Sequence, residues 1–235
     1  MDELFDDVAG AMREELAGDA TGHDIHHAWR VFAIGRRIAR AEGADPLVVG
    51  AAALTHDVHR VMADDEFVPP RESLPRVASI LRDVGFPGDR VEAVLHCVAV
   101  HEEYGFDYVA GGGDGEAGDN PAETAEAGDN PAETLEALVV QDADNLDAIG
   151  AVGVARAFQF GGAHGNLIWS EHPVPERAGA DDHSERGDTV AHFRAKLLHL
   201  AEHMNTEAGR DLAAERHAFL EEFLDRFERE WRSEV

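Results

Sequence analysis

The segment LVVGAAALTHDV, residues 47–58, limits the folds open to this chain more than any other segment. Its apolar side chains surround the helix axis instead of forming one stripe, so a helix here has to be buried on all sides. His56 and Asp57 lie near its end, and ionisable groups in such surroundings are costly unless they are paired or bind a metal ion. The segment therefore predicts a central buried helix that is followed by a candidate catalytic or metal-binding site.

Helical periodicity runs through most of the chain, and no convincing alternation of apolar and polar residues indicates a strand. Asp45 and Pro46 are residue types favoured at the start of a helix, and Gly43 is suited to end the helix before them. We predict an all-α fold with a helical core over residues 1–160 and C-terminal helices over residues 188–235 that pack on the same domain. The predicted helices cover residues 2–16, 24–42, 47–58, 71–84, 89–101, 132–149, 152–160, 189–204 and 207–231.

Two segments interrupt this helical pattern. Residues 161–187 are rich in Gly, Pro, His and acidic residues, which predicts a long loop. Residues 110–131 form an inserted acidic loop, and the sequence EAGDNPAET occurs at residues 116–124 and again at 126–134. Two copies are too few for a repeat fold, so we interpret the first copy as a duplication that lengthened a surface loop. The second copy runs into a helix, which we expect Asn130 and Pro131 to cap.

The charge of the chain limits the classes of partner that it can bind. The formal net charge is −28, and Lys196 is the only lysine. Such a surface repels nucleic acid and anionic membranes, and there is no apolar run of about 18 residues that would span a membrane. The single cysteine, Cys97, excludes a disulfide within the chain and fits a reducing cytoplasm. General solubility is one explanation, but we prefer adaptation to high salt, because abundant acids beside almost no lysine resemble proteins of halophilic archaea.

Three predicted helices carry His or Asp residues at their ends or centres. Residues 23–27, HDIHH, contain four side chains that could bind a metal ion, and residues 139–147 contain three aspartates. One divalent ion could take an imidazole from the first helix, the His–Asp pair from the second and a carboxylate from the third. Such ligands suit Mn²⁺, Mg²⁺, Fe²⁺, Ni²⁺, Co²⁺ or Zn²⁺ without choosing among them, and the lack of thiolates excludes a Cys-type zinc site.

Periodicity alone does not choose among the three aspartates. Asp142 shares the apolar stripe of its helix, whereas Asp144 lies about 200° from it at roughly 100° per residue. If the helix is central, both faces are buried and Asp144 is equally well placed. Asp147 lies one turn from Asp144, where it either orients a ligand or its water, or is a helix-end carboxylate.

The order His, then His-Asp, then Asp on a helical background resembles the HD-domain superfamily of metal-dependent phosphohydrolases. The resemblance covers nearly the whole chain and implies an HD-type helical bundle with a C-terminal helical extension. It also implies cytoplasmic hydrolysis of a small phosphorylated metabolite, a nucleotide first of all, with one divalent ion and in some members a second. The matching segments are HDIHHAWRV, GAAALTHDVHR, TLEALVVQDADNLDAIGAVGVARAF, FGGAHG and HFRAKLLHLAEHMNTEAGRDLAAERHAFLEEFLDRFEREW.

The resemblance also implies which residues bind the ion. The superfamily has an Arg-Val pair that begins three residues after the first ligand, which matches Arg30 and selects His27. His56 and Asp57 match the signature pair, and Asp144 matches the last ligand within Ala-Asp-x-Leu. Asp57 is also the carboxylate that we expect to share a proton with the attacking water.

Other residues are candidates for contacts around the ion. Arg30 could pair with Asp57 or Asp144 or bind phosphate through its planar guanidinium group, and Arg156 could face the phosphate. Some superfamily members bind a second ion with extra histidines, and His101 is the better candidate here. The remaining candidates for contacts with ligands or substrate are His23, Asp142 and Asp147.

Alternative functions follow from the same pattern. His59 and Arg60 stand where some HD hydrolases have acidic residues that help to activate water, which leaves the general base open. One alternative is hydrolysis of a signalling nucleotide, for which the expected extra motifs are missing or incomplete. Another is a non-catalytic HD-fold protein that binds a nucleotide or metal in regulation. We expect a small phosphorylated partner and neither nucleic acid nor membrane, with a homo-oligomer left open.

Overall fold

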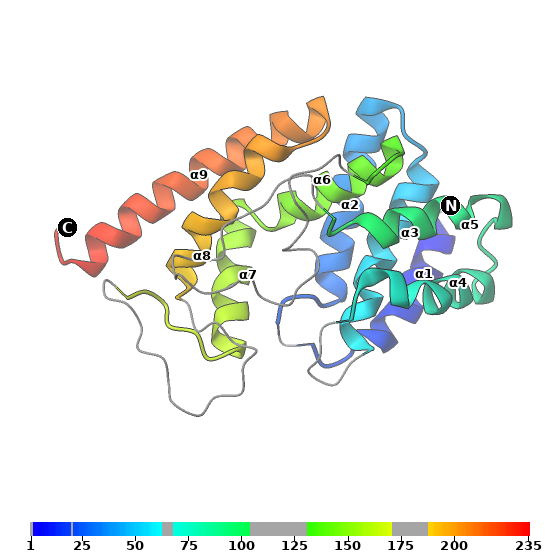
Figure 1. The fold of residues 1–235 in the computed structure, drawn as a ribbon, viewed down its shortest axis with the longest axis horizontal. Helices are drawn as coiled ribbons and strands as arrows, with labels where there is room; N and C mark the ends of the chain where they lie inside the picture. The colour runs from blue at the N-terminus through cyan, green and yellow to red at the C-terminus, as the bar shows by residue number, and fades with distance from the viewer. Residues whose placement is uncertain (1, 20, 63–67, 104–130, 171–187) are drawn as a thin grey trace.

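The computed structural model of the chain describes residues 2–19, 21–62, 68–103, 131–170 and 188–235 (Figure 1). These residues form α-helices and short 3₁₀ helices, with no strand beyond one isolated bridge between Leu167 and Asp188, which confirms the all-α class. The elements are α1 (Asp2–Glu15), α2 (Ile25–Glu42), α3 (Pro46–Thr55), η1 (His56–Val61), η2 (Pro70–Ser73), α4 (Leu74–Asp83), η3 (Gly88–Arg90), α5 (Val91–Val100), α6 (Leu135–Asp147), α7 (Gly150–Ala163), α8 (Thr189–Ala195), η4 (Leu197–His203) and α9 (Glu207–Trp231).

Helix α3 lies at the centre of the core, as its composition predicts. All its residues from Val48 to Thr55 are buried, and it contacts α1, α2, α5 and α6. The carboxylate of Asp45 caps its start by accepting a hydrogen bond from the backbone N–H of Leu47 at 2.8 Å. A Cβ atom on Gly50 would lie 2.7 Å from the ring of Phe5, so glycine allows α1 to approach closely. The C-terminal end of α3 is therefore surrounded by helices that can bring side chains to it.

Helices α2 and α6 flank α3. Asp24 caps α2 by accepting a hydrogen bond from the backbone N–H of His27, and Gly43 ends it with a φ of 83°. Helix α6 is capped by Thr134, not by Asn130 and Pro131 as we expected, because the Thr134 hydroxyl accepts a hydrogen bond from the N–H of the third helical residue. Helix α6 is buried on several faces, which removes the objection to Asp144 as a site residue.

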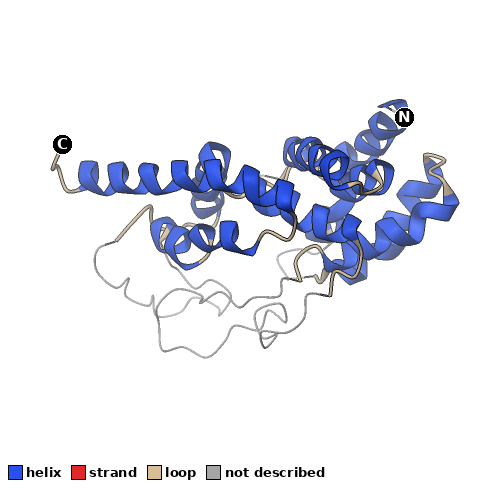
Figure 2. Ribbon diagram, turned by 90° about the horizontal axis from the view of Figure 1, so that it is seen from above, coloured by secondary structure: helices blue, strands red, loops and turns tan. Residues whose placement is uncertain are grey.

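The C-terminal helices pack on the core through α7 and α9, and α9 extends outward to the C terminus (Figures 1 and 2). The predicted helix 189–204 is divided at Lys196 into α8 and η4, whereas α7 continues to Ala163, inside the predicted loop. Residues 110–130, with the first copy of the duplication, and residues 171–187 lie outside the described part, so those loop predictions stay predictions. No helix within the described ranges has the length and apolar character needed to cross a membrane.

Candidate metal centre

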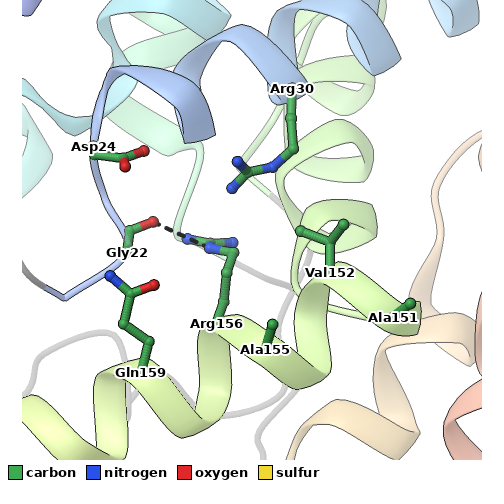
Figure 3. A pocket seen from close by; sticks show the side chains of 8 residues that line it. All are labelled: Gly22, Asp24, Arg30, Ala151, Val152, Ala155, Arg156 and Gln159. Atoms are coloured by element: carbon green, nitrogen blue, oxygen red, sulfur yellow. Dashed lines mark hydrogen bonds between the residues drawn. The ribbon is translucent and has the colours of Figure 1, made fainter.

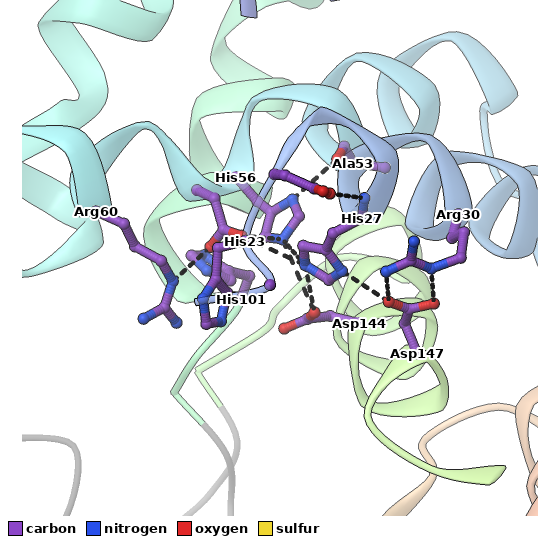
Figure 4. A network of polar contacts seen from close by, with 12 residues as sticks. His23, His27, Arg30, Ala53, His56, Arg60, His101, Asp144 and Asp147 are labelled. Atoms are coloured by element: carbon purple, nitrogen blue, oxygen red, sulfur yellow. Dashed lines mark hydrogen bonds and ion pairs between the residues drawn. The ribbon is translucent and has the colours of Figure 1, made fainter. Parts of the chain in front are cut away.

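Four side chains from α2, η1 and α6 meet beyond the end of α3 (Figure 4). Nε2 of His27 lies 3.1 Å from Nε2 of His56, 3.3 Å from Oδ2 of Asp57 and 3.4 Å from Oδ1 of Asp144. Nε2 of His56 lies 3.3 Å from Oδ2 of Asp57 and 3.8 Å from Oδ1 of Asp144. The structure thus brings together all four residues that the sequence predicted as ligands.

The arrangement of these atoms fits a divalent cation. Oδ2 of Asp57 is buried and has no hydrogen-bond partner among the described residues. The imidazole nitrogens of His27 and His56 face each other at 3.1 Å. A cation that binds nitrogen and oxygen at about 2.0–2.2 Å holds its ligands at such separations. Imidazoles with carboxylates and no thiolate suit a divalent ion but do not select one.

The carboxylates make this centre strongly attractive to positive charge. Burial alone would lower the pKa of His27, but the nearby carboxylates of Asp144, Asp147 and Asp57 raise it to about 10. Burial would raise the pKa of Asp144, but the hydrogen bond with His27 and the charge of His56 hold it far below its usual value. Both shifts have the same cause, since the carboxylates around these imidazoles favour positive charge at the centre.

Hydrogen bonds fix the orientation of both imidazoles. Nδ1 of His56 lies 2.9 Å from the backbone carbonyl oxygen of Ala53, and Nδ1 of His27 lies 2.8 Å from Oδ2 of Asp147. In each ring a proton on Nδ1 can be donated to that oxygen, so that Nε2 faces the centre. Contacts of this kind orient metal-binding histidines and increase their basicity.

The buried carboxylate of Asp147 pairs with two arginines in addition to His27. Oδ1 of Asp147 accepts a hydrogen bond from Nε of Arg30 at 2.8 Å, and Oδ2 accepts one from Nη2 of Arg30 at 3.0 Å. Nη1 of Arg156 lies 3.1 Å from the same Oδ2. Arg30 pairs with Asp147 and not with Asp57 or Asp144, the partners considered from the sequence, since it lies one helical turn beyond the histidine that Asp147 holds.

The second oxygen of Asp57 is held by a residue to which the sequence assigned no role. Nε of Arg60 donates a hydrogen bond to Oδ1 of Asp57 at 2.7 Å, and its Nη2 donates to Glu102. Burial would raise the pKa of Asp57, but the charges of His56 and Arg60 hold it well below its usual value. The position of Arg60 three residues after Asp57 was a usable signal, because neighbours at this spacing meet on a helical turn.

Two further candidates, His23 and Asp142, lie in different surroundings. The His23 ring lies 5.7 Å from the ring of His27 between centroids, and burial with the nearby charge of Arg60 lowers the pKa of His23 to about 3. Asp142 lies away from the centre, which corrects its assignment as a contact of ligand or substrate. Its carboxylate accepts hydrogen bonds from Asn205 and Thr206 at the start of α9.

A pocket of about 320 Å³ is lined in part by the two arginines that pair with Asp147 (Figure 3). Arg30 and Arg156 both line it, and Nε of Arg156 also donates to the carbonyl oxygen of Gly22 at 3.1 Å. The pocket is therefore linked to His27 through Asp147, which pairs with both arginines and with Nδ1 of His27. The complete lining is Gly22, Asp24, Arg30, Ala151, Val152, Ala155, Arg156 and Gln159.

Comparison with known proteins identifies the family. Residues 24–149 match the HD domain, and they include all four ligand candidates. The chain belongs to the HD-domain family. The chain is also similar to YpgQ of Bacillus subtilis, with 34% identity over 215 residues, which cover 92% of this chain and 87% of YpgQ.

Solved structures show the same fold. A protein of Lactobacillus plantarum is 30% identical with a TM-score of 0.72, and 99% of each chain is covered. YpgQ in complex with ADP is 30% identical with a TM-score of 0.66, over 97% of this chain and 95% of that one. An HD-superfamily hydrolase of Bacillus thuringiensis is 28% identical with a TM-score of 0.67, over 98% of both chains.

Membership in the HD family supports metal-dependent hydrolase chemistry in general and confirms the family resemblance. Clusters of His, Asp and Glu that could hold a metal ion are present in the structure, as the family implies. These relatives are bacterial, so they lend no support to the predicted halophilic archaeal origin.

Replacement of Asp147 by Asn is expected to weaken metal binding by about 10- to 100-fold, the usual cost of losing a partner that orients a ligand. The amide keeps the size of the side chain but loses the negative charge that His27 and Arg30 share. Calorimetric titration with Mn²⁺ measures the change. Asp225→Asn, at an exposed position on α9, is the matched control and should bind like the wild type. Equal affinity in both variants would contradict the orienting role.

Proposed function

We propose that this protein is a metal-dependent phosphohydrolase acting on a small phosphorylated metabolite, with nucleotides as the leading class. The observation that carries the proposal is the convergence of His27, His56, Asp57 and Asp144 at one centre beside an arginine-lined pocket. A divalent ion bound there supplies a charge that polarises a phosphoryl oxygen and makes a water more acidic. Phosphoryl transfer needs little beyond such charge and correct positioning.

Within this proposal, Asp57 has two roles. Its Oδ2 faces the centre as a ligand, and Arg60 holds Oδ1 so that the carboxylate cannot turn away. We assign to Asp57 the contact that shares a proton with the attacking water. His27 and His56 hold the ion through Nε2, and each is fixed by an oxygen at Nδ1.

The pocket supports a phosphorylated substrate within this proposal. The guanidinium groups of Arg30 and Arg156 keep N–H groups beyond those paired with Asp147, and planar guanidinium groups bind phosphate well. A phosphate chain that reaches from the metal centre into the pocket would meet both of them. The nucleotide class is supported by YpgQ, whose structure was determined with ADP.

A phosphate-release screen tests the function directly. Purified protein is analysed for metal and then assayed over nucleotides and simple phosphoesters with Mn²⁺, Mg²⁺, Ni²⁺ and Co²⁺ at low and high salt. Release that depends on the added ion and on an identified nucleotide would support the proposal. Nucleotide binding without release under any condition would replace it by a regulatory role.

Replacement of Arg156 by Gln is expected to raise the KM for the nucleotide by about 10- to 100-fold, because a charge-assisted hydrogen bond contributes about 1.5–3 kcal/mol. Metal affinity should change less, since Arg30 still pairs with Asp147 through two hydrogen bonds. Steady-state kinetics with a parallel metal titration separates the two effects. Arg82→Gln, exposed on α4, is the control. An unchanged KM in Arg156→Gln would remove the pocket from the substrate path.

A further inference from the structure

Helix α9, which packs on α6 and α7, contacts the end of α6 through an arginine that lies outside the metal centre. Nη1 of Arg216 donates a hydrogen bond to the carbonyl oxygen of Leu146. This carbonyl belongs to the peptide unit that joins Leu146 to Asp147, whose carboxylate holds Nδ1 of His27 (Figure 4). A side chain of α9 is therefore bonded to the backbone that carries Asp147.

The carbonyl oxygen of Leu146 lies in the last turn of α6, where backbone acceptors have no regular partner within the helix. Its contact with the backbone N–H of Ile149 is long, at 3.4 Å. The guanidinium group of Arg216 supplies a charged donor at this point, and positive charge is favourable at the C-terminal end of a helix. Arg216 therefore caps α6 at the turn that ends on Asp147.

The side-chain stem of Arg216 lies over the corner between α6 and α7. Gly150, the first residue of α7, has a φ of 75°, which is in the left-handed region that favours glycine. A Cβ atom on Gly150 would lie 3.1 Å from Cγ of Arg216, so the absence of a side chain lets the arginine pack closely. The same arginine thus contacts both sides of the corner, because its guanidinium group binds the end of α6 and its stem packs on the start of α7.

The angle at this corner determines how Asp147 and Arg156 face each other. Asp147 ends α6 and Arg156 lies on α7, and Nη1 of Arg156 is 3.1 Å from Oδ2 of Asp147. The same Oδ2 lies 2.8 Å from Nδ1 of His27. A change in the angle between α6 and α7 would therefore move the arginine, the carboxylate and the imidazole relative to one another.

The charge of Arg216 also acts on Asp147. Arg216 is half-buried, and burial lowers its pKa, whereas the negative charge of Asp147 acts in the opposite direction and favours the cation. A guanidinium group stays protonated in proteins at neutral pH. Asp147 is therefore attracted to Arg216 in addition to Arg30 and Arg156, with which it forms ion pairs.

We propose that Arg216 is a positioning residue that holds Asp147 in the orientation from which it fixes His27. Arg216 acts through the backbone at the end of α6 and through the corner with α7, and not by contact with a metal ion or a substrate. The inference rests on the proposed metal-dependent function, within which Asp147 orients a ligand. It makes α9 part of the support of the metal centre.

A double-mutant cycle on metal affinity tests this role. The Kd for Mn²⁺ is measured by calorimetry on the full-length wild type, Arg216→Met, Asp147→Asn and the double variant. Methionine keeps the stem over Gly150 but removes the donor and the charge. We expect Arg216→Met to weaken Mn²⁺ binding by about 5- to 10-fold, the scale of one net hydrogen bond. The double variant should lose no more affinity than Asp147→Asn alone, because Arg216 acts through Asp147.

Arg210→Met is the matched control on the same helix. Nη1 of Arg210 also donates to backbone carbonyl oxygens, those of Met204 and Asn205, but these lie at the start of α9. This variant should keep the Mn²⁺ affinity of the wild type. If Arg216→Met does not fold, Arg216→Gln takes its place in the cycle, because the amide retains one donor group.

Several results would overturn the proposal. Wild-type Mn²⁺ affinity in a folded Arg216→Met protein is one, and losses that add fully in the double variant are another, since additive losses indicate a general effect on stability. Wild-type affinity in Asp147→Asn beside a loss in Arg216→Met would also overturn it. Failure of the wild type to bind Mn²⁺ would overturn both this proposal and the proposed function. Non-additive losses in a protein that releases no phosphate would support the role of Arg216 and contradict only the proposed hydrolysis.

Discussion

Replacement of Asp57 by Asn is expected to abolish metal-dependent phosphate release, with a loss of at least about 100-fold. Oδ2 of Asp57 is the buried oxygen without a hydrogen-bond partner that faces His27 and His56. An amide there is neutral and a poorer ligand, so both the metal ion and the attacking water lose their carboxylate contact. The loss is therefore larger than that from Asp147, which acts through His27.

The fold should survive this change, which makes the result interpretable. Asn has nearly the size of Asp, and Arg60 keeps its ion pair with Glu102. Mn²⁺ at 100 times the Kd should stabilise the wild type by about 2.7 kcal/mol against unfolding, and this gain should largely disappear in Asp57→Asn. Asp83→Asn, an exposed change on α4, should retain both activity and metal stabilisation. Full phosphate release by a folded Asp57→Asn protein would exclude Asp57 from the mechanism.

The central helix could be predicted from a local pattern, whereas the choice of His27 and Asp144 as ligands depended on the resemblance to the HD-domain superfamily. An apolar segment without a polar face can only be buried, and α3 is. Asp24, Gly43 and Asp45 act as helix caps through contacts within a few residues of themselves, so their residue types were sufficient. The caps fix where α2 and α3 begin, and this in turn brings His27 to the end of α3.

What could not be predicted depends on residues far apart in the chain. Arg60 and Glu102 pair across 42 positions, and Arg30 and Asp147 pair across 117. No periodic pattern records such partners. The ring contact between His59 and His101, with centroids 5.4 Å apart, is of the same kind, since it requires the packing of α5 against η1. One local pattern was visible in the sequence at both His56 and His101. In each case an apolar helix is followed by a histidine and then an acidic residue.

Asp142 and Asp144 show why a helical stripe could not identify the ligand. Both lie on α6, which is buried on several faces, and the fully buried one, Asp142, is not the ligand candidate, since the Asp144 side chain is 18% exposed. Burial raises the pKa of Asp142 in spite of its hydrogen bonds, whereas His27 holds the pKa of Asp144 far below its usual value. The partners of each carboxylate identify its role: Asp144 faces the candidate metal centre, and Asp142 binds the start of α9.

Asp142 connects α6 to the N-terminal end of α9. Its oxygens accept hydrogen bonds from the backbone N–H groups of Asn205 and Thr206 at 2.7 and 2.8 Å, and from their side chains at 3.0 and 2.6 Å. A Cβ atom on Gly209 would lie 2.3 Å from Oδ2 of Asp142, so a glycine in the first turn of α9 lets the carboxylate approach. This contact therefore joins the C-terminal helices to the core without reaching the metal centre.

Replacement of Asp142 by Ala is expected to lower the free energy of unfolding by about 2–4 kcal/mol, because it leaves N–H groups at the start of α9 without their acceptor. For a chain of this size, that corresponds to a fall in Tm of roughly 5–15 °C. Thermal and denaturant unfolding measure it, and Asp211→Ala, exposed on α9, should unfold like the wild type. Metal affinity of the folded variant should stay unchanged. A variant with wild-type stability but weakened metal binding would instead return Asp142 to the site and remove Asp144 as the preferred ligand from α6.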